Sequence, residues 1–245
     1  LRFAPTSVQI PPNSPVQTPL IFRRDRKCPP ERIQRKIWFT EPYIVAYDLE
    51  TTGLGKTNDI AIREIAAASF ETNDIFRRAV KPWRETTAQA ETVAPDTPDI
   101  KEASGWEDVG PDFWRWVEVQ LARTEPEAKI YLSGWNSKPY DSRILMFENQ
   151  RAGIDIDKLA NSVYFVDMLQ VFKKLHPEVK APRDLGSIHQ LLVGKDITSA
   201  HTALGDSQAV KCISHILASE HEGKFWDVLQ DSAESIHGVM KRCGI

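Results

Sequence analysis

The spacing of hydrophobic and polar positions along the chain predicts an α/β protein. Short apolar stretches rich in β-branched and aromatic residues are typical of strands, and we expect five: residues 43–49, 61–71, 75–81, 129–133 and 163–166. Residues 72–74 (Thr-Asn-Asp) favour a tight turn between the second and third stretches. Apolar residues at helical spacing predict an amphipathic helix containing Val109, Phe113, Trp116, Val117 and Leu121, and further helices are expected at 139–151, 167–175, 184–192 and 204–220.

The order of these elements predicts a three-layer α/β domain with a mixed sheet and helices on both faces. Three strands come first, two more alternate with helices, and a run of helices ends the chain. The first three strands can form an antiparallel meander. Residues 82–105 contain three prolines and are expected to be a loop. No second hydrophobic core is evident, so we expect one domain over residues 41–245.

Residues 1–40 differ in composition from the rest of the chain and are expected to be a basic, proline-rich arm. Seven of the 16 prolines fall in residues 1–30. Residues 1–40 carry eight Lys or Arg and two acidic residues, whereas residues 41–245 carry 23 basic and 32 acidic residues. Such an arm cannot form a continuous helix. Two interpretations stay open: a segment that contacts nucleic acid or a protein partner, and a solvated linker.

The remaining composition excludes some classes and leaves others open. No apolar run is long enough to span a membrane, and no cleavable signal peptide is visible. Cys28, Cys212 and Cys243 are odd in number and match no zinc spacing, so we expect reduced thiols in an intracellular protein of unknown compartment. The acidic body is unusual for a nucleic-acid binder, which normally presents a basic face, unless bound cations reverse its field.

The first candidate chemistry lies at the end of the first predicted strand. Asp48 and Glu50 are two residues apart, so both side chains leave the same face. Two neighbouring carboxylates at the end of an apolar strand repel each other and lose hydration, and a hard divalent cation compensates well for both effects. The alternative is an acidic strand end that faces solvent.

Two later segments carry similar signals. Asp141 begins a predicted helix and shares its apolar face, so it is either an inward-facing ligand or a simple helix cap. Asp206 is in phase with the apolar stripe of the 204–220 helix, where a carboxylate is costly unless it is paired or metal-bound. His201 lies five residues before Asp206, just ahead of that helix.

Taken together, these segments resemble the DEDDh exonucleases, a branch of the ribonuclease H-like superfamily. The first family motif is matched by residues 48–53, the second by Asn136 with Asp141, and the third by residues 201–206. The residues of the third motif most resemble those of the three-prime repair exonucleases. Residues 62–66 and 166–169 also resemble family segments, whereas Trp135 stands where relatives often have His.

The resemblance implies a ribonuclease H-like sheet of five strands and catalytic roles for Asp48, Glu50, Asp141, His201 and Asp206. It also implies that residues 51–54 (Thr51, Thr52, Gly53 and Leu54) lie against the terminal nucleotide, and Asn136 near it. The expected activity is 3′→5′ hydrolysis of single-stranded DNA or RNA. The four carboxylates suit two Mg²⁺ or Mn²⁺ ions, and His201 suits a general base at neutral pH.

Several alternatives stay open at this stage. The domain is either an active exonuclease or an inactive nuclease-fold module that binds nucleic acid or a protein partner, and the basic arm can also tether it to a larger complex. Dimers occur among the relatives, so a homodimer is one alternative. Trp83, Trp106 and Trp135 lie in predicted loops and are candidates for stacking on bases, whereas Trp116 is expected in the core.

Overall fold

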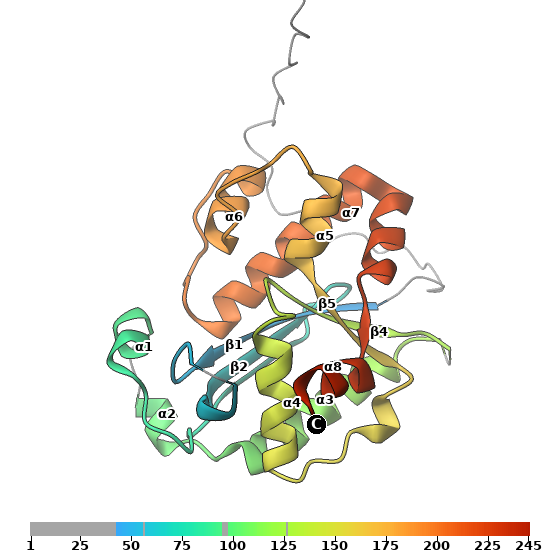
Figure 1. The fold of residues 1–245 in the computed structure, drawn as a ribbon. Helices are drawn as coiled ribbons and strands as arrows, with labels where there is room; N and C mark the ends of the chain where they lie inside the picture. The colour runs from blue at the N-terminus through green and yellow to red at the C-terminus, as the bar shows by residue number, and fades with distance from the viewer. Residues whose placement is uncertain (1–42, 56, 95–97, 126) are drawn as a thin grey trace, which may run out of the picture.

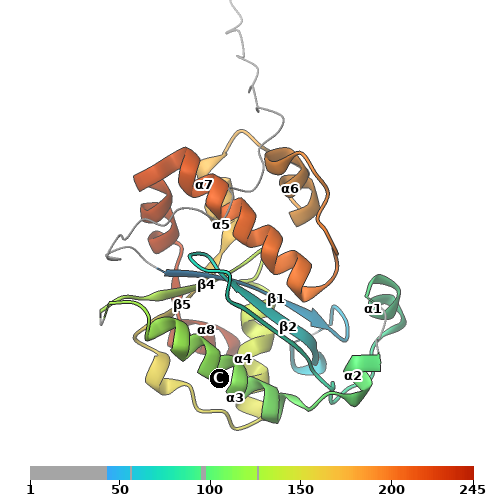
Figure 2. The ribbon, with the colours of Figure 1, turned by 180° about the vertical axis from the view of Figure 1, so that it is seen from behind.

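A computed structural model describes residues 43–245 except 56, 95–97 and 126 (Figure 1). The basic arm expected at residues 1–40, the domain start expected near Trp38, and Cys28 lie outside the described residues. The described chain forms one sheet between two layers of helices, with α5, α6 and α7 on one face and α3, α4 and α8 on the other (Figures 1 and 2). The predicted α/β class with helices on both faces is confirmed.

The sheet has six strands within the described residues, in the order β3-β2-β1-β4-β5-β6. The first three strands are antiparallel neighbours, as expected, while β4 is parallel to β1 and β5 is parallel to β4. The strands are β1 (Tyr43–Thr51), β2 (Ile62–Ser69), β3 (Ile75–Ala79), β4 (Ile130–Gly134), β5 (Val163–Asp167) and β6 (Glu234–Ser235). The sixth strand was not predicted, because two residues are too few to show a strand periodicity.

Alternation along β1 divides the core into two halves. Tyr43, Val45 and Tyr47 pack with α3 and α4, whereas Ile44 and Ala46 pack with α5 and α7. The major helices are α3 (Trp106–Leu121), α4 (Asp141–Arg151), α5 (Met168–Leu175), α6 (Leu185–Val193), α7 (Ala203–Asp231) and α8 (Ile236–Cys243). Two short 3₁₀ segments cover Thr57–Asp59 and Asp157–Leu159. Because strand side chains alternate, the even-numbered residues at the end of β1, Asp48 and Glu50, point to the α7 side of the sheet.

Three expectations about secondary structure need correction. The segment 82–105 is not entirely loop, because it contains α1 (Ala88–Val93) and α2 (Pro98–Glu102); Thr87 caps α1 by accepting a hydrogen bond from the Ala90 amide at 3.2 Å. The last strong helix extends beyond residue 220 to Asp231, with a break at Glu222, where φ is +36°. The helix α8 follows it and was not predicted.

The predicted role of stacking on bases is wrong for two of the three candidate tryptophans. Trp106 is 1% exposed and begins α3, and its indole N–H donates to Asn149 Oδ1 at 3.1 Å. Trp135 is also buried and donates to the Arg183 carbonyl oxygen. Both indoles therefore have their polar atom satisfied inside the protein. Trp83 is 39% exposed but donates to Glu148, and Trp116 packs against the core as expected.

Two further expectations concern membranes and thiols. None of the helices in the described ranges is long and apolar enough to cross a membrane. Among the described residues, neither the buried Cys212 nor the half-buried Cys243 forms a disulfide.

Candidate active site

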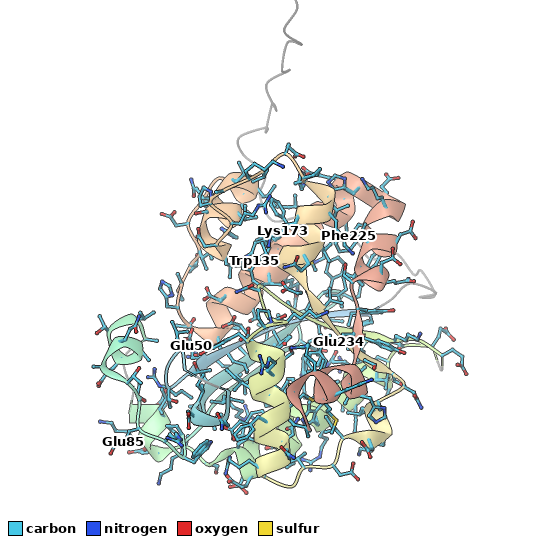
Figure 3. The ribbon with its side chains drawn as sticks, viewed as in Figure 1. Glu50, Glu85, Trp135, Lys173, Phe225 and Glu234 are labelled. Atoms are coloured by element: carbon cyan, nitrogen blue, oxygen red, sulfur yellow. The ribbon has the colours of Figure 1, made fainter. Side chains whose placement is uncertain are left out.

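The site begins at the carboxyl end of β1, where Asp48 and Glu50 lie on one face of the strand. Asp48 is paired with Ala66 and Glu50 with Glu64 of β2, and the register shifts between Glu50 and Thr51. A shift of this kind bends a strand locally and is frequent beside active sites. Figure 3 places Glu50 at the end of β1, next to the start of α7. Both carboxylates therefore point toward the layer that contains α7.

Asp206 comes to the same place from α7. The helix begins after Thr202, whose hydroxyl oxygen accepts a hydrogen bond from the Gly205 amide at 3.0 Å. Glu64 Oε2 accepts a second bond, from the Ala203 amide at 3.0 Å. These two acceptors fix the first turn of α7, and Asp206 is in that turn. The pairing of β1 with β2 thus sets the position of Asp206 relative to Asp48.

The structure brings three of the four predicted carboxylates into one cluster. One oxygen from each of Asp48, Glu50 and Asp206 lies within 4.8 Å of the others. Asp141 is outside that group of three, but its charge is the largest electrostatic influence on Asp48 after burial. Asp141 is the first residue of α4 and is 7% exposed. Three of the expected carboxylates therefore meet from β1 and α7, and the fourth, Asp141 of α4, is near enough for its charge to act on Asp48.

Burial raises the pKa of all four predicted carboxylates, Asp48, Glu50, Asp141 and Asp206. Burial is the main cause for each: it raises the pKa of Glu50 and of Asp141 to about 7, and that of Asp48 well above its usual range. The pKa of Asp206 is also raised by burial, against the opposing charge of His201. The neighbouring carboxylates add to the rise for Asp48 and Glu50. Such a set is costly when fully ionised and fits oxygen-ligated divalent cations.

His201 lies on the exposed loop that precedes α7. It has a φ of +61°, and Ser199 in the same loop has a φ of +58°. Left-handed conformations are unusual for residues other than glycine and cluster at functional sites. The loop also packs closely on the helix start, because a Cβ on Gly205 would lie 2.2 Å from the Ser199 carbonyl oxygen. Glycine at position 205 therefore lets the His201 loop approach α7.

The residues expected to contact the substrate surround the end of β1. Thr51 and Thr52 are buried, and the Thr52 hydroxyl accepts a hydrogen bond from the Ala61 amide at 3.0 Å. Leu54 is 77% exposed, the largest value among the described large hydrophobic side chains. Asn136 is exposed after β4 with a φ of +53°. Among residues 51–54, Leu54 is therefore the exposed side chain.

Sequence reasoning gave no site role to three residues that support this arrangement. Glu64 caps α7 and contributes charge to the cluster. Tyr140 has its hydroxyl 2.9 Å from Thr51 Oγ1 and also donates to the Gly53 carbonyl oxygen, so it links α4 to the turn after β1. Asp167 is buried, caps α5 through the Leu169 amide, and raises the pKa of Asp141. Glu64 and Asp167 fall in the two minor family-like segments, which were the available signal.

Fold and site together define an α/β nuclease with an acidic centre of the kind that holds divalent metal ions. A family model described as "Exonuclease" (RNase T) matches residues 45–213, which contain all five predicted catalytic positions. The chain belongs to this exonuclease family, a DEDDh-type branch of the ribonuclease H-like superfamily. The expected family, the hydrolytic nuclease class and the dependence on divalent cations are thereby supported by the same match.

Comparison with other known proteins adds the fold and little more. A search of curated proteins finds no match. Among the 184 solved chains that match, one is described as "3'-end specific recognition of histone mRNA stem-loop by 3'-exonuclease". It has a TM-score of 0.59 at 16% identity and covers 75% of this chain and 84% of its own. At this identity the likeness establishes a shared fold, including the mixed sheet.

Proposed function

We propose that this protein is a 3′→5′ exonuclease that releases mononucleotides from single-stranded nucleic acid with two divalent ions, Mg²⁺ or Mn²⁺. One observation carries the proposal: Asp48, Glu50 and Asp206 bring ligand oxygens within 4.8 Å of one another, and the charge of Asp141 acts on Asp48. A group of carboxylates this close, with pKa values raised by burial and repulsion, matches the hard oxygen ligands that these ions prefer.

The four carboxylates are the proposed ligands of the two ions. Asp48 is central, since Asp141, Asp206 and Glu50 all act on its pKa. Asp48, Glu50 and Asp206 would hold the ions directly, together with Asp141. When bound, such ions lower the pKa of a water molecule and stabilise the leaving oxygen of a phosphodiester. With cations bound, the acidic cluster of this acidic domain would present positive charge to the anionic nucleic-acid strand.

His201 is the proposed general base. His201 is exposed, and its charge and its backbone both act to lower the pKa of Asp206, so the residue is close to the cluster. Imidazole accepts a proton efficiently near neutral pH. In this scheme the water loses its proton to His201 as its oxygen attacks phosphorus. The bond to the leaving 3′-oxygen of the preceding nucleotide breaks, and that oxygen takes a proton from solvent. Products are a mononucleotide with a 5′-phosphate and a strand shorter by one residue.

The turn after β1 is the proposed seat of the terminal nucleotide. Gly53 and the turn are fixed by Tyr140 and Thr51, which leaves Leu54 to pack against the last base as an apolar wedge. Asn136, which is exposed after β4, is the other proposed contact with the terminal nucleotide. The 3′ polarity is supported by the family and by the structural neighbour, which is described as a 3′-exonuclease. DNA and RNA differ at the 2′-OH, and both are retained as substrates.

A gel time course tests the proposal directly. Single strands of DNA and RNA, labelled at the 5′ or the 3′ end, are incubated with Mg²⁺, Mn²⁺ or EDTA, with Asp48→Asn as the matched inactive control. We expect a metal-dependent ladder from the 5′ label and early mononucleotide release from the 3′ label. Absence of cleavage by a folded protein that still binds the strand would instead support the inactive binding module, and early mononucleotides from the 5′ label would reverse the polarity.

A further inference from the structure

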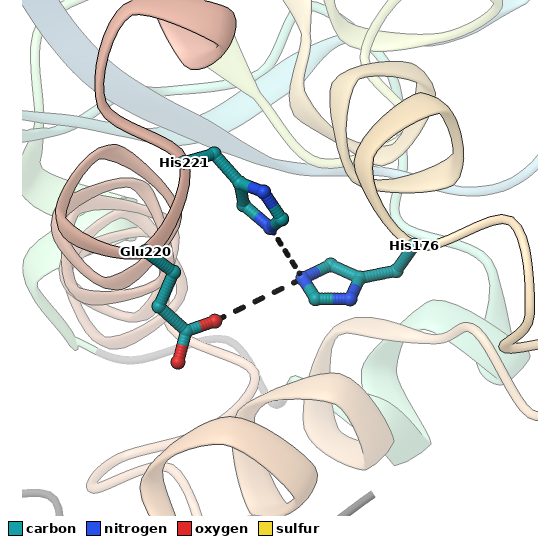
Figure 4. A group of neighbouring side chains, drawn as sticks. All are labelled: His176, Glu220 and His221. Carbon is teal, nitrogen blue, oxygen red and sulfur yellow. Dashed lines mark hydrogen bonds and ion pairs between the residues drawn. The ribbon is translucent and has the colours of Figure 1, made fainter. Parts of the chain in front are cut away.

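A second group of potential metal ligands lies far along α7 from the acidic cluster. His176, Glu220 and His221 each place one ligand atom within 4.8 Å of the others (Figure 4). His176 caps the end of α5, and the other two lie on α7 just before its break at Glu222. Asp206 is on the first turn of α7, so about 20 Å of helix separates it from Glu220 at 1.5 Å per residue. The two groups are therefore distinct sites.

The two imidazoles face each other through the same ring atom. His176 Nε2 and His221 Nε2 are 3.1 Å apart. Two nitrogen ligands of a tetrahedral Zn²⁺, each about 2.0–2.1 Å from the ion, lie roughly 3.3 Å apart. In the absence of an ion, the N–H of one ring would have to donate a hydrogen bond to the bare nitrogen of the other. The observed separation fits a shared cation with a small outward movement of one ring.

The contact between Glu178 and His176 Nδ1 determines that Nε2 is the His176 atom available to bind a metal ion. Glu178 Oε1 lies 3.0 Å from His176 Nδ1. Because a carboxylate only accepts, this contact places the ring proton on Nδ1 and leaves Nε2 with its lone pair directed at His221. A carboxylate behind a ligating histidine is the usual arrangement at protein metal sites, where it orients the ring and increases its basicity. The His176 ring is further held against Phe172, with centroids 5.0 Å apart.

Glu220 offers a third ligand atom and, together with Glu178, compensating negative charge. Its Oε2 is 3.9 Å from His176 Nε2, so a shift of less than about 1 Å would bring it to ligand spacing. Glu178 and Glu220 contribute two negative charges near the pair, whereas Lys224 adds a positive charge that acts on His221. The His₂Glu set matches borderline metals such as zinc better than Mg²⁺, which prefers oxygen ligands alone.

We propose that His176, Glu220 and His221 form a Zn²⁺-class metal site that joins the end of α5 to α7 beside the break at Glu222. Two imidazoles and one carboxylate leave a fourth position for water. His176 is 7% exposed and is held from behind by Glu178, so the site has a fixed half on α5 and a more exposed half on α7. Its occupation would lock the break in α7 and stabilise the fold.

Zinc titration calorimetry on the full chain without a histidine tag tests this site. Asp48→Asn with Asp206→Asn removes two ligands of the acidic cluster, so that binding to the second site is measured alone. In this background we expect one Zn²⁺ per chain, with at least tenfold weaker binding in His221→Gln and a smaller loss in Glu220→Gln. His237→Gln, which changes an exposed histidine elsewhere, is the matched control and should bind like the background.

Cobalt absorption and thermal unfolding supply independent readouts. Co²⁺ should give visible bands typical of a tetrahedral nitrogen-containing site in the background protein and in His237→Gln, and none in His221→Gln. Zn²⁺ should raise the Tm of the same two proteins only. His221 is half-exposed, so its replacement is expected to leave the fold intact by circular dichroism. Equal zinc affinity in His221→Gln and its background, or no zinc binding by the background, would reduce the group to a hydrogen-bonded histidine pair.

Discussion

Glu64 Oε2 accepts a hydrogen bond from the backbone N–H of Ala203 at 3.0 Å. The bond spans 139 positions of the chain and joins β2 to the first residue of α7. Glu64 is 8% exposed, and its other oxygen pairs with Arg77 of β3. Since β2 is paired directly with β1, this contact sets the distance between the strand that carries Asp48 and the helix that carries Asp206.

Replacing Glu64 should therefore reduce activity through the placement of Asp206. We expect Glu64→Ala to lower kcat by about 10–100-fold, the range typical of groups that orient metal ligands, with weaker Mn²⁺ binding by calorimetry. Glu64→Gln keeps an oxygen acceptor for the Ala203 amide and should recover most of both. If the Gln variant is as poor as the Ala variant, the charge of Glu64 matters more than its hydrogen bond.

His201→Ala should separate proton transfer from metal binding. Removing a general base typically costs about 10²–10⁴-fold in rate, and His201 lies outside the carboxylate cluster. We expect kcat to fall within that range while Mn²⁺ affinity changes less than about twofold. Asp206→Asn is the contrasting variant, because it should lose both activity and metal affinity. Cleavage by His201→Ala at the parental rate would show that another group takes the proton.

Leu54→Ala should weaken binding of the terminal nucleotide without a cost in stability. Leu54 is 77% exposed, so its side chain contributes little to the folded core. Burying a leucine against a base would contribute about 1.5–3 kcal/mol, which corresponds to a rise in KM of roughly tenfold or more. Steady-state kinetics on short single strands measure this change. Val119→Ala, at an exposed position on α3, is the control and should leave KM unchanged.

The predictable part of the site was the part that follows from local chain geometry. Alternation places Asp48 and Glu50 on one face of β1, and the structure confirms it. The helical phase of Asp206 also predicted an inward carboxylate. That these groups meet depends on β-sheet pairing and on the Glu64 bond to α7, which no periodicity contains. The motif resemblance supplied this link.

What the sequence could not indicate depends on partners that are distant along the chain. Trp106 and Trp135 lie outside the predicted helices and strands, yet both are buried. The Trp106 N–H is accepted by Asn149 and the Trp135 N–H by the Arg183 carbonyl. The break at Glu222 interrupts a helix whose apolar pattern was correctly predicted up to that region. His176 and His221 meet across 45 positions, so their pairing had no sequence signal.

Removing divalent ions should make stability depend on pH through the acidic cluster. Burial raises the folded-state pKa of Glu50 and Asp141 to about 7, above the usual values near 4 in an unfolded chain. The stabilisation associated with a raised pKa is complete below the unfolded value and is lost as pH rises through about 7. In EDTA, the free energy of unfolding should therefore fall between about pH 4.5 and 8 by a few kcal/mol.

Bound Mg²⁺ or Mn²⁺ should oppose this loss, because the ions favour the ionised carboxylates. The gain in Tm on adding metal is expected to be larger at pH 8 than at pH 6. Glu50→Gln supplies the control: it removes one titrating group and should flatten the pH dependence in EDTA. A metal-induced gain in Tm that is equal at both pH values in the parent protein would contradict the assigned pKa shifts.

His215 should produce the opposite pH dependence at lower pH. Its ring stacks on Phe70 with centroids 3.7 Å apart, and burial, with the charge of Lys211, lowers its pKa to about 4. A depressed pKa gives stability that is present above the unfolded value near 6.5 and is lost as pH falls toward 4. Allowing for partial exposure of the ring, this group accounts for about 2 kcal/mol of unfolding free energy.

Urea unfolding of the parent and His215→Gln at intervals between pH 4 and 7 isolates this contribution. The variant cannot gain a proton at this position, so the difference in unfolding free energy between the two proteins should shrink as pH falls. The carboxylate cluster titrates equally in both and cancels from the difference. A difference that stays constant across the range would mean that the ring is protonated as readily in the folded protein as in the unfolded chain, and that its burial against Phe70 does not oppose its charge.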